Sequence, residues 1–127
     1  MLGSTKVIAF AAVRESSRAR AFYGDVLGLR LLREDGYALV FDAGGTMLRV
    51  SVVPEPVMAP YTVLGWEVND IRAAVAALGG RGVEFQHYGF PGQDESGIWT
   101  APDGDKVAWF KDPDGNVLSV TQFVKPE

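Results

Sequence analysis

The chain runs through one order of secondary structure twice, and this internal duplication limits its fold more than any other feature. In residues 6–53, the hydrophobic pattern predicts a strand, a helix and then further strands. Residues 61–123 repeat that order, and both copies end in a strand that begins at a glycine. The segment 54–60 holds three prolines and cannot pair as a central strand. We therefore interpret residues 1–127 as a single domain with two modules, 6–53 and 61–123, joined by a linker at 54–60.

Composition and charge exclude several classes of function. The 127 residues suffice for one domain with a modest core, and the net charge of −4 argues against a nucleic-acid partner. The absence of cysteine excludes disulfides, thiolate nucleophiles and cysteine-based zinc sites. No apolar run approaches the ~20 residues that cross a membrane, and no basic and then apolar leader opens the chain. We therefore expect no membrane partner and a cytoplasmic location.

Two segments have the apolar spacing and the end signals of helices. The first follows Ser16 and Ser17, either of which can cap its N-terminus, and it ends at Gly28. The second follows Asn69 or Asp70, which are equally suitable caps. The strands that we predict are 7–13, 29–32, 37–41, 47–53, 61–68, 83–85, 98–101, 106–111 and 116–123.

Three segments resemble one known family. They are Arg-Ala-Phe-Tyr-Gly-Asp-Val-Leu-Gly-Leu at 20–29, Gly-Trp-Glu-Val-Asn-Asp at 65–70 and Phe-Lys-Asp-Pro-Asp-Gly-Asn-Val-Leu at 110–118. These segments are similar to segments of the glyoxalase, bleomycin resistance and extradiol dioxygenase superfamily, also called vicinal oxygen chelate proteins. The resemblance implies an α+β fold in which paired βαβββ modules form a cupped mixed sheet with helices outside. It also implies a pocket between the modules and, as is usual for the family, a homodimer.

The resemblance also indicates where a metal would lie. In the metal-dependent members, side chains from the first and last strand of each module converge in the cup. The corresponding positions here are Ile8, Arg49, Val63 and Ser119. Ile and Val offer no lone pair, Arg is a permanent cation, and Ser is a weak neutral ligand. We therefore expect no metal and no other cofactor.

Strand alternation supports this assignment of the two faces. Side chains alternate between the faces of a sheet, and the strand neighbours of these four positions, such as Val7, are apolar, as a helix-covered face requires. The cup face is then apolar with a few polar groups, which is typical of a small-molecule site. The residues that we expect to bind a ligand there are Ile8, Phe10, Met47, Arg49, Ser51, Val63, Glu67, Ser119 and Thr121.

The charged candidates each have two interpretations. Arg49 can clamp a carboxylate or phosphate with its planar guanidinium, or it can form a structural ion pair with Glu67 across the cup. Glu67 is the single candidate for a general base, and the favoured explanation is that it is the partner of Arg49 or a rim residue. The hydroxyl side chains on the same face either orient a ligand or are ordinary strand residues.

Aromatic and loop residues leave similar alternatives. Phe10, Trp99 and Trp109 can stack on a flat ligand or belong to the core. The segment 87–96 has no periodicity, and irregular segments of this length are often functional, so we expect it to border the pocket. His87 within it is either a lid residue that titrates near neutral pH or a solvated loop residue.

Two classes of function remain open at this point. The first is a protein of the bleomycin-resistance type that binds a small molecule without a metal. The second is an enzyme, either a glyoxalase-like lyase with an atypical metal site or a small-molecule enzyme that uses Glu67 as a general base. The missing ligand set disfavours the metal-dependent lyase and dioxygenase activities of the family, so the sequence favours binding.

Overall fold

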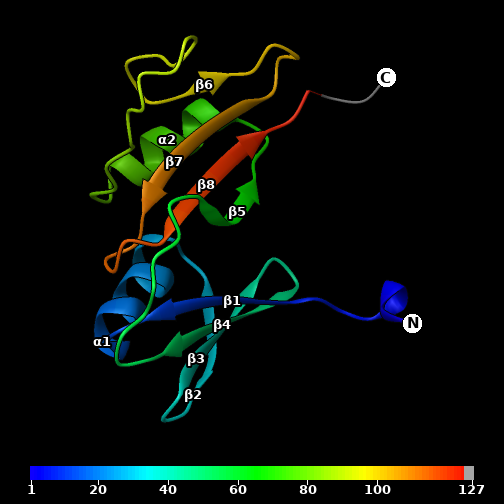
Figure 1. The fold of residues 1–127 in the computed structure, drawn as a ribbon, viewed down its shortest axis with the longest axis vertical. Coiled ribbons are helices and arrows are strands. Elements are labelled where there is room, and N and C mark those ends of the chain that lie inside the picture. The colour runs from blue at the N-terminus through cyan, green and yellow to red at the C-terminus, as the bar shows by residue number, and fades with distance from the viewer. Residues whose placement is uncertain (125–127) are drawn as a thin grey trace. The chain divides into compact units, whose positions relative to one another are not determined.

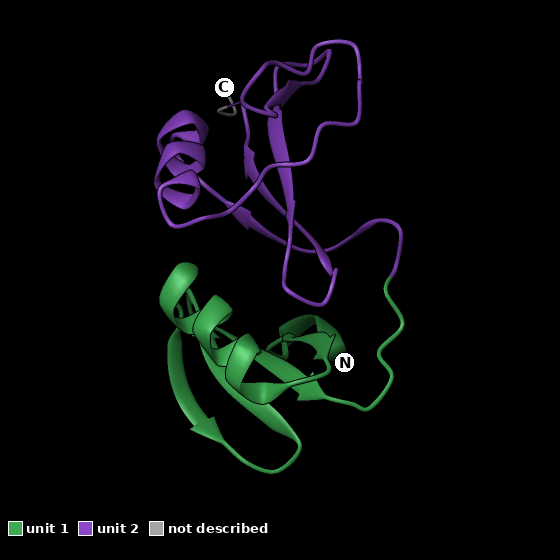
Figure 2. Cartoon of the chain, turned by 90° about the vertical axis from the view of Figure 1, so that its left-hand side faces the viewer, with its two compact units in different colours: residues 1–58 green, residues 59–127 purple. Residues whose placement is uncertain are grey.

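The structure is a computed structural model that describes residues 1–124 of the 127. It divides into two compact units, residues 1–58 and residues from Ala59 onward (Figure 2). The division falls inside the proline-containing segment 54–60. The assignment of both units to one domain remains a prediction.

The first unit is a four-stranded mixed sheet with a helix on one face (Figure 1). The strand order is β1-β4-β3-β2, in which β1 and β4 are parallel and the other pairs are antiparallel. The elements are η1 (Leu2–Ser4), β1 (Ile8–Val13), α1 (Ser16–Ala19), η2 (Arg20–Val26), β2 (Arg30–Glu34), β3 (Ala38–Ala43) and β4 (Thr46–Val52).

The second unit repeats this topology. Its strand order is β5-β8-β7-β6, again with the first pair parallel and the remaining pairs antiparallel. The elements are β5 (Thr62–Glu67), α2 (Ile71–Gly79), β6 (Trp99–Thr100), β7 (Lys106–Lys111) and β8 (Val117–Gln122). The prediction of an α+β fold with two βαβββ modules is therefore confirmed. The strand predicted at 83–85 is reduced to a single bridge between Phe85 and Phe110.

The start of the first helix differs from the prediction. Glu15 flanks the helix, and no side chain caps its first N–H groups, so the prediction of a cap at Ser16 or Ser17 is wrong. The hydroxyl of Ser17 donates instead to the carboxylate of Glu15. Beyond α1 the helix widens into the π-helical segment η2, which presents Tyr23 to the sheet. Tyr23 is fully buried, and its ring centroid lies 6.0 Å from that of Phe41.

The second helix begins as predicted. Asp70 caps α2, and its side chain accepts a hydrogen bond from the N–H of Ala73 at 3.1 Å. The N–H of Ile71 donates to the side-chain oxygen of Gln122 on β8, at 2.9 Å. This bond satisfies a second donor of the helix N-terminus and ties the helix to its sheet.

Burial alternates along β1, β4, β5 and β7, whereas β2 is exposed throughout and the first four residues of β3 and of β8 are all buried. The helix-facing residues Val13, Leu48, Val50 and Leu118 are fully buried. Val7 is the exception, because it precedes β1 and is 73% exposed. The core of each unit therefore lies between the sheet and its helix, and the opposite face of each sheet is left to carry the candidate site.

Candidate functional site

The open face of the first sheet carries a row of four residues, one from each strand. Phe10 on β1 lies opposite Arg49 on β4, Arg49 lies opposite Val40 on β3, and Val40 lies opposite Arg33 on β2. Directly paired residues project from the same face of a sheet. Two arginines therefore lie on this face with a fully buried valine between them.

Arg49 has no close polar partner in its own unit. Within residues 1–58, all of which are described, its half-buried side chain makes no hydrogen bond and no ion pair. The N–H groups of Tyr37 and Ala38 donate to the Asp35 carboxylate and lower its pKa from the ordinary 3.8. The positive charges of Arg49 and Arg33 lower this pKa further. Both guanidinium groups therefore act on one region of the face.

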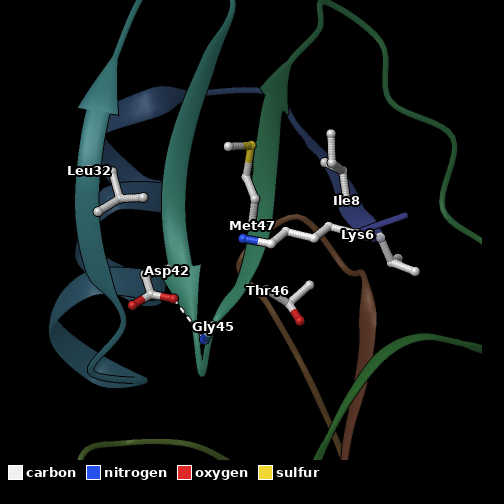
Figure 3. Close-up of a pocket in the computed structure, with 8 residues that line it drawn as sticks. Lys6, Ile8, Leu32, Asp42, Gly45, Thr46 and Met47 are labelled. Atoms are coloured by element: carbon white, nitrogen blue, oxygen red, sulfur yellow. Dashed lines mark hydrogen bonds between the residues drawn. The ribbon is translucent and has the colours of Figure 1, made fainter. Parts of the chain in front are cut away.

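A pocket of about 580 Å³ adjoins this row in the first unit (Figure 3). Two of the predicted ligand-binding residues, Ile8 and Met47, line it. The carboxylate of Asp42 accepts a hydrogen bond from the N–H of Gly45 at 2.8 Å and pairs with Arg30 at 3.4 Å. The lining residues are Lys6, Val7, Ile8, Leu32, Asp42, Gly45, Thr46 and Met47.

A β-bulge in β2 brings an unpredicted arginine to the site. The register between β2 and β3 shifts between Leu31 and Arg33, which leaves Leu32 as the extra residue. Leu32 lines the pocket, and the next residue, Arg33, joins the row of Arg49. The sequence-based strand ended at Leu32, so Arg33 was missed. The adjacent leucines at 31 and 32 break the period of two, and this is the signal that indicates a bulge.

The open face of the second sheet carries Ser119. It lies opposite Gly65 on β5 and Trp109 on β7. Its side chain is 6% exposed, and its Oγ lies 2.7 Å from the position that a Cβ at residue 65 would occupy. Ser119 therefore fills the space over Gly65. Glu67 and Thr121 form the next row, and Glu67 is exposed.

The register at Val63 differs from the simple alternation. A shift between Thr62 and Leu64 puts Thr62 opposite Val117, the position that alternation assigned to Val63. Val63 is 39% exposed, and Thr62 rather than Val63 lines a pocket on this sheet. The residue that corresponds by position to a metal ligand is thus displaced by a bulge.

Aromatic rings gather around the second pocket, which has a volume of about 300 Å³. The ring centroids of Tyr88 and Phe90 lie 5.5 and 5.7 Å from that of Trp109, and those of Trp99 and Trp109 are 6.1 Å apart. Tyr88 and Phe90 are 43% and 44% exposed. The residues that line the pocket are Pro60, Tyr61, Thr62, Tyr88, Phe90, Trp109 and Val117.

Gln93 holds the segment that supplies these rings. Its side-chain nitrogen donates to the carbonyl oxygens of Gln86 and Gly97 at 2.9 and 3.0 Å. Its side-chain oxygen accepts from the N–H of Tyr88 at 2.8 Å. Segment 87–96 therefore has a fixed internal structure in the second unit. Its place beside a pocket between the modules remains a prediction.

Phe10, the remaining hydroxyl residues and His87 differ in how far they are buried. Phe10 is 59% exposed on the open face of the first sheet, so it does not belong to the core. Ser51 follows Arg49 on that face, opposite Ala12 and Ala38. Ser51 and Thr121 are half-buried. His87 is exposed. Their roles toward a ligand remain predictions.

The donor groups do not fit the metal site that the fold family implies. Ile8 and Arg49 provide no lone pair for a divalent cation, and the hydroxyl of Ser119 is directed over Gly65. In the part of the chain that the structure describes, no three His, Asp or Glu side chains cluster in a way that holds a metal.

Comparison with known proteins establishes the family. Residues 7–120 match the Glyoxalase/Bleomycin resistance protein/Dioxygenase superfamily. The chain belongs to this superfamily, which confirms the resemblance seen in the sequence. No curated protein matches the sequence significantly. None of the helices in the described residues is long and apolar enough to cross a membrane.

Solved structures share the fold at low sequence identity. A glyoxalase family protein from Enterococcus faecalis is 21% identical, with a TM-score of 0.76 over 95% of this chain and 99% of that chain. A genomically encoded fosfomycin resistance protein from Listeria monocytogenes is 11% identical, with a TM-score of 0.75 over 95% and 94%. A lactoylglutathione lyase from Agrobacterium tumefaciens is 20% identical, with a TM-score of 0.65 over 91% and 92%.

Proposed function

We propose that the protein binds a small organic anion without a metal, on the open face of its first sheet. The observation that carries the proposal is the environment of Arg49. Its guanidinium is half-buried beside Phe10 and Val40 and has no hydrogen-bonding partner in its unit. It also occupies a position where metal-dependent relatives carry a metal ligand, so the sign of the charge is inverted.

Physical chemistry favours an anion at this position. A guanidinium that is partly removed from water is stabilised by partners that accept its N–H groups. Its planar fork matches the two oxygens of a carboxylate or two oxygens of a phosphate. The neighbouring apolar side chains of Ile8, Phe10 and Met47 then bind the carbon skeleton. Ser51, Val63, Ser119 and Thr121 remain proposed ligand-binding residues on their sheets.

Titration with benzoate and phenyl phosphate, followed by NMR of the labelled protein, tests the proposal. We expect both anions to shift the resonances of Ile8, Phe10 and Arg49 in the presence of a chelator. Arg49→Met is expected to reduce affinity at least tenfold, and Arg49→Lys to weaken binding less. The control is Arg14→Met, because Arg14 is an exposed arginine outside β1. Unchanged affinity in Arg49→Met contradicts the proposal.

Metal independence has a separate measurement. Because the donor set offers no anionic ligand at residues 8, 49, 63 or 119, we expect binding to be unaffected by chelator. Elemental analysis after mild purification that finds near-stoichiometric zinc, nickel, iron or manganese contradicts this expectation. So does binding that is lost with chelator and restored by metal.

The alternative functions remain hypotheses. Glu67 lies exposed on the second sheet, and no contact within residues 59–124 marks it as a general base. The competing interpretation of Arg49 is that it only balances Glu67. The double variant Arg49→Met, Glu67→Gln separates the two: normal anion affinity in the double variant favours charge balance, whereas lost affinity favours the anion site.

We also propose that the chain acts as a cytoplasmic homodimer. The edge strands of each sheet support an association surface. Light scattering at high concentration is expected to give the dimer mass, and a strict monomer contradicts it. Fractionation of the host cells tests the location.

A further inference from the structure

We infer that Arg33 is a second anion-binding residue, and that together with Arg49 it selects ligands with a dianionic tetrahedral oxyanion head next to an apolar body. The inference rests on the proposed function and names the class of ligand. The features that carry it are the register of the sheet, the bulge at Leu32 and the pocket beside the row.

The register puts the two guanidinium groups on one face. Arg49 on β4 and Arg33 on β2 are both paired with Val40 on β3. Neighbouring strands lie about 4.8 Å apart, so the two Cα atoms are separated by roughly 10 Å. Long arginine side chains reach across this distance, and their alkyl stems can cover the valine between them. Val40 is indeed fully buried, although it lies on the open face.

The bulge is what aims Arg33 at this face. Leu31 lies opposite the core residue Phe41, so regular alternation would put residue 33 on the helix-covered face. The extra residue, Leu32, reverses the alternation and turns Arg33 toward the row of Arg49. The bulge, which interrupts the regular pairing of β2 with β3, thus brings a second positive charge to the site.

Neither arginine is neutralised within its unit. In residues 1–58, Arg33 and Arg49 form no ion pair and no hydrogen bond, and both act on Asp35 only at longer range. The Asp35 carboxylate already accepts two backbone N–H groups. The other acidic group on this face, Asp42, pairs with Arg30. Lys6 lines the pocket, forms no ion pair or hydrogen bond through its side chain in residues 1–58, and adds a further positive charge.

The chain as a whole is acidic, with a net charge of −4, so two arginines on one face differ in charge from the rest of the protein. Residues 1–58 hold seven Lys and Arg against six Asp and Glu, whereas residues 59–127 hold five against ten. An acidic protein therefore carries two arginines that form no ion pair in residues 1–58, Arg33 and Arg49, on one face of its first sheet. Two guanidinium groups match a head with two negative charges and three or more acceptor oxygens better than a single carboxylate.

The pocket sets the shape of the rest of the ligand. Ile8 and Met47 lie one row, or two residues, from Phe10 and Arg49 along their strands. Two residues of a strand span about 7 Å. An apolar group of ring size in the pocket can therefore extend an oxyanion to the arginine row. A phosphate ester, a phosphonate and a sulfonate share this tetrahedral chemistry, and they differ in charge.

Three probes with the same ring test the inference. Phenyl phosphate at pH 8 is a tetrahedral dianion, benzenesulfonate a tetrahedral monoanion and benzoate a planar monoanion. In the unmodified protein we expect phenyl phosphate to bind about fivefold more tightly than either monoanion. In Arg33→Met, the advantage of phenyl phosphate is expected to disappear while benzoate binds nearly as before. Arg33→Lys is expected to restore part of the advantage.

The possible outcomes separate this inference from the proposed function. An unchanged preference for phenyl phosphate in Arg33→Met, with affinity lost in Arg49→Met, overturns the two-arginine site and leaves the proposed anion site standing. Failure of all three probes to bind the unmodified protein overturns both. The ratio of affinities is informative because a purely structural role of Arg33 weakens all probes alike.

Discussion

Ser119 and Gly65 share one space on the open face of the second sheet: the hydroxyl oxygen of Ser119 lies 2.7 Å from where a Cβ at residue 65 would be. The two residues are paired across β5 and β8, and Ser119 is buried. A Cβ at residue 65 would meet the hydroxyl of Ser119, so the serine can occupy this space because its neighbour is a glycine. The pair therefore fixes the position of a polar group on this face.

The first prediction concerns this pair. Gly65→Ala is expected to destabilise the protein by about 1–3 kcal/mol, because the new methyl group displaces a buried hydroxyl. Ser119→Ala in addition is expected to recover part of the loss, since it removes the oxygen that clashes. Chemical unfolding of the four proteins in this cycle measures the coupling. Gly36→Ala is a suitable control, because nothing lies within 4 Å of a Cβ there. A Gly65→Ala variant as stable as the parent contradicts the packing.

The second prediction concerns the turn between β7 and β8. The buried carboxylate of Asp112 accepts hydrogen bonds from the N–H groups of Asp114 and Asn116, both at 2.9 Å, and from the side-chain nitrogen of Asn116 at 2.7 Å. Asp112→Ala leaves these donors without an acceptor and is expected to cost about 1–3 kcal/mol of unfolding free energy. Asp103→Ala, in an exposed turn with one accepted bond, is expected to cost clearly less. Equal losses of stability in Asp112→Ala and Asp103→Ala, measured by thermal unfolding, contradict this explanation.

The third prediction is a pH dependence at Asp94. Burial opposes the charge of Asp94, but hydrogen bonds from the Ile98 N–H and from Arg72 outweigh it and lower its pKa below 3.8. Because the folded-state pKa is the lower one, this stabilisation is present above pH 3.8 and is lost as the pH falls through the folded-state value. Asp94→Asn should therefore be less stable than the parent at pH 6, and the difference should shrink below pH 3.8.

Thermal unfolding between pH 6 and pH 2 measures this difference. The matched control is Glu95→Gln, because Glu95 is the exposed neighbouring acid and forms no hydrogen bond or ion pair in residues 59–124. A gap between Asp94→Asn and the parent that stays constant down to pH 2 excludes the proposed role of the charge.

The architecture follows from periodic features that the sequence displays directly. The duplicated order of apolar segments, the glycine turns and the Asp70 cap are local signals, and the observed topology agrees with them. The first helix shows where local signals fail. Ser16 and Ser17 have the chemistry of caps, but Glu15 takes the flanking position, and the segment after Ala19 widens to bury Tyr23 against Phe41. Tertiary packing decided that geometry.

The residues of the candidate site could also be predicted only in part. Alternation predicted that Ile8 and Met47 share a face, and both line one pocket. Alternation missed Arg33. It also assigned to Val63 the position opposite Val117 that Thr62 occupies, because the register shifts at each of these two places. A single strand read alone shows at most that its alternation breaks, as it does at Leu31 and Leu32. Which residue is left unpaired depends on the partner strand, so the register cannot be read from that strand alone.

The last prediction concerns Gln93, which fixes the segment that carries Tyr88 and Phe90. Its amide makes three hydrogen bonds to the backbone, two as donor and one as acceptor. Gln93→Glu replaces the donor nitrogen with an anionic oxygen that faces the carbonyls of Gln86 and Gly97, so repulsion replaces two attractions. We expect the N–H of Tyr88 to exchange with solvent at least tenfold faster, which is about 1.4 kcal/mol of lost protection.

Hydrogen exchange followed by NMR measures this change, and the fluorescence of Trp99 and Trp109 should shift with it as Tyr88 and Phe90 move away. Ser96→Ala is the control within the same segment, because among residues 59–124 Ser96 uses only its backbone N–H, which donates to Asp94. Unchanged protection of Tyr88 in Gln93→Glu means that the aromatic rings, rather than the glutamine, hold the segment in place.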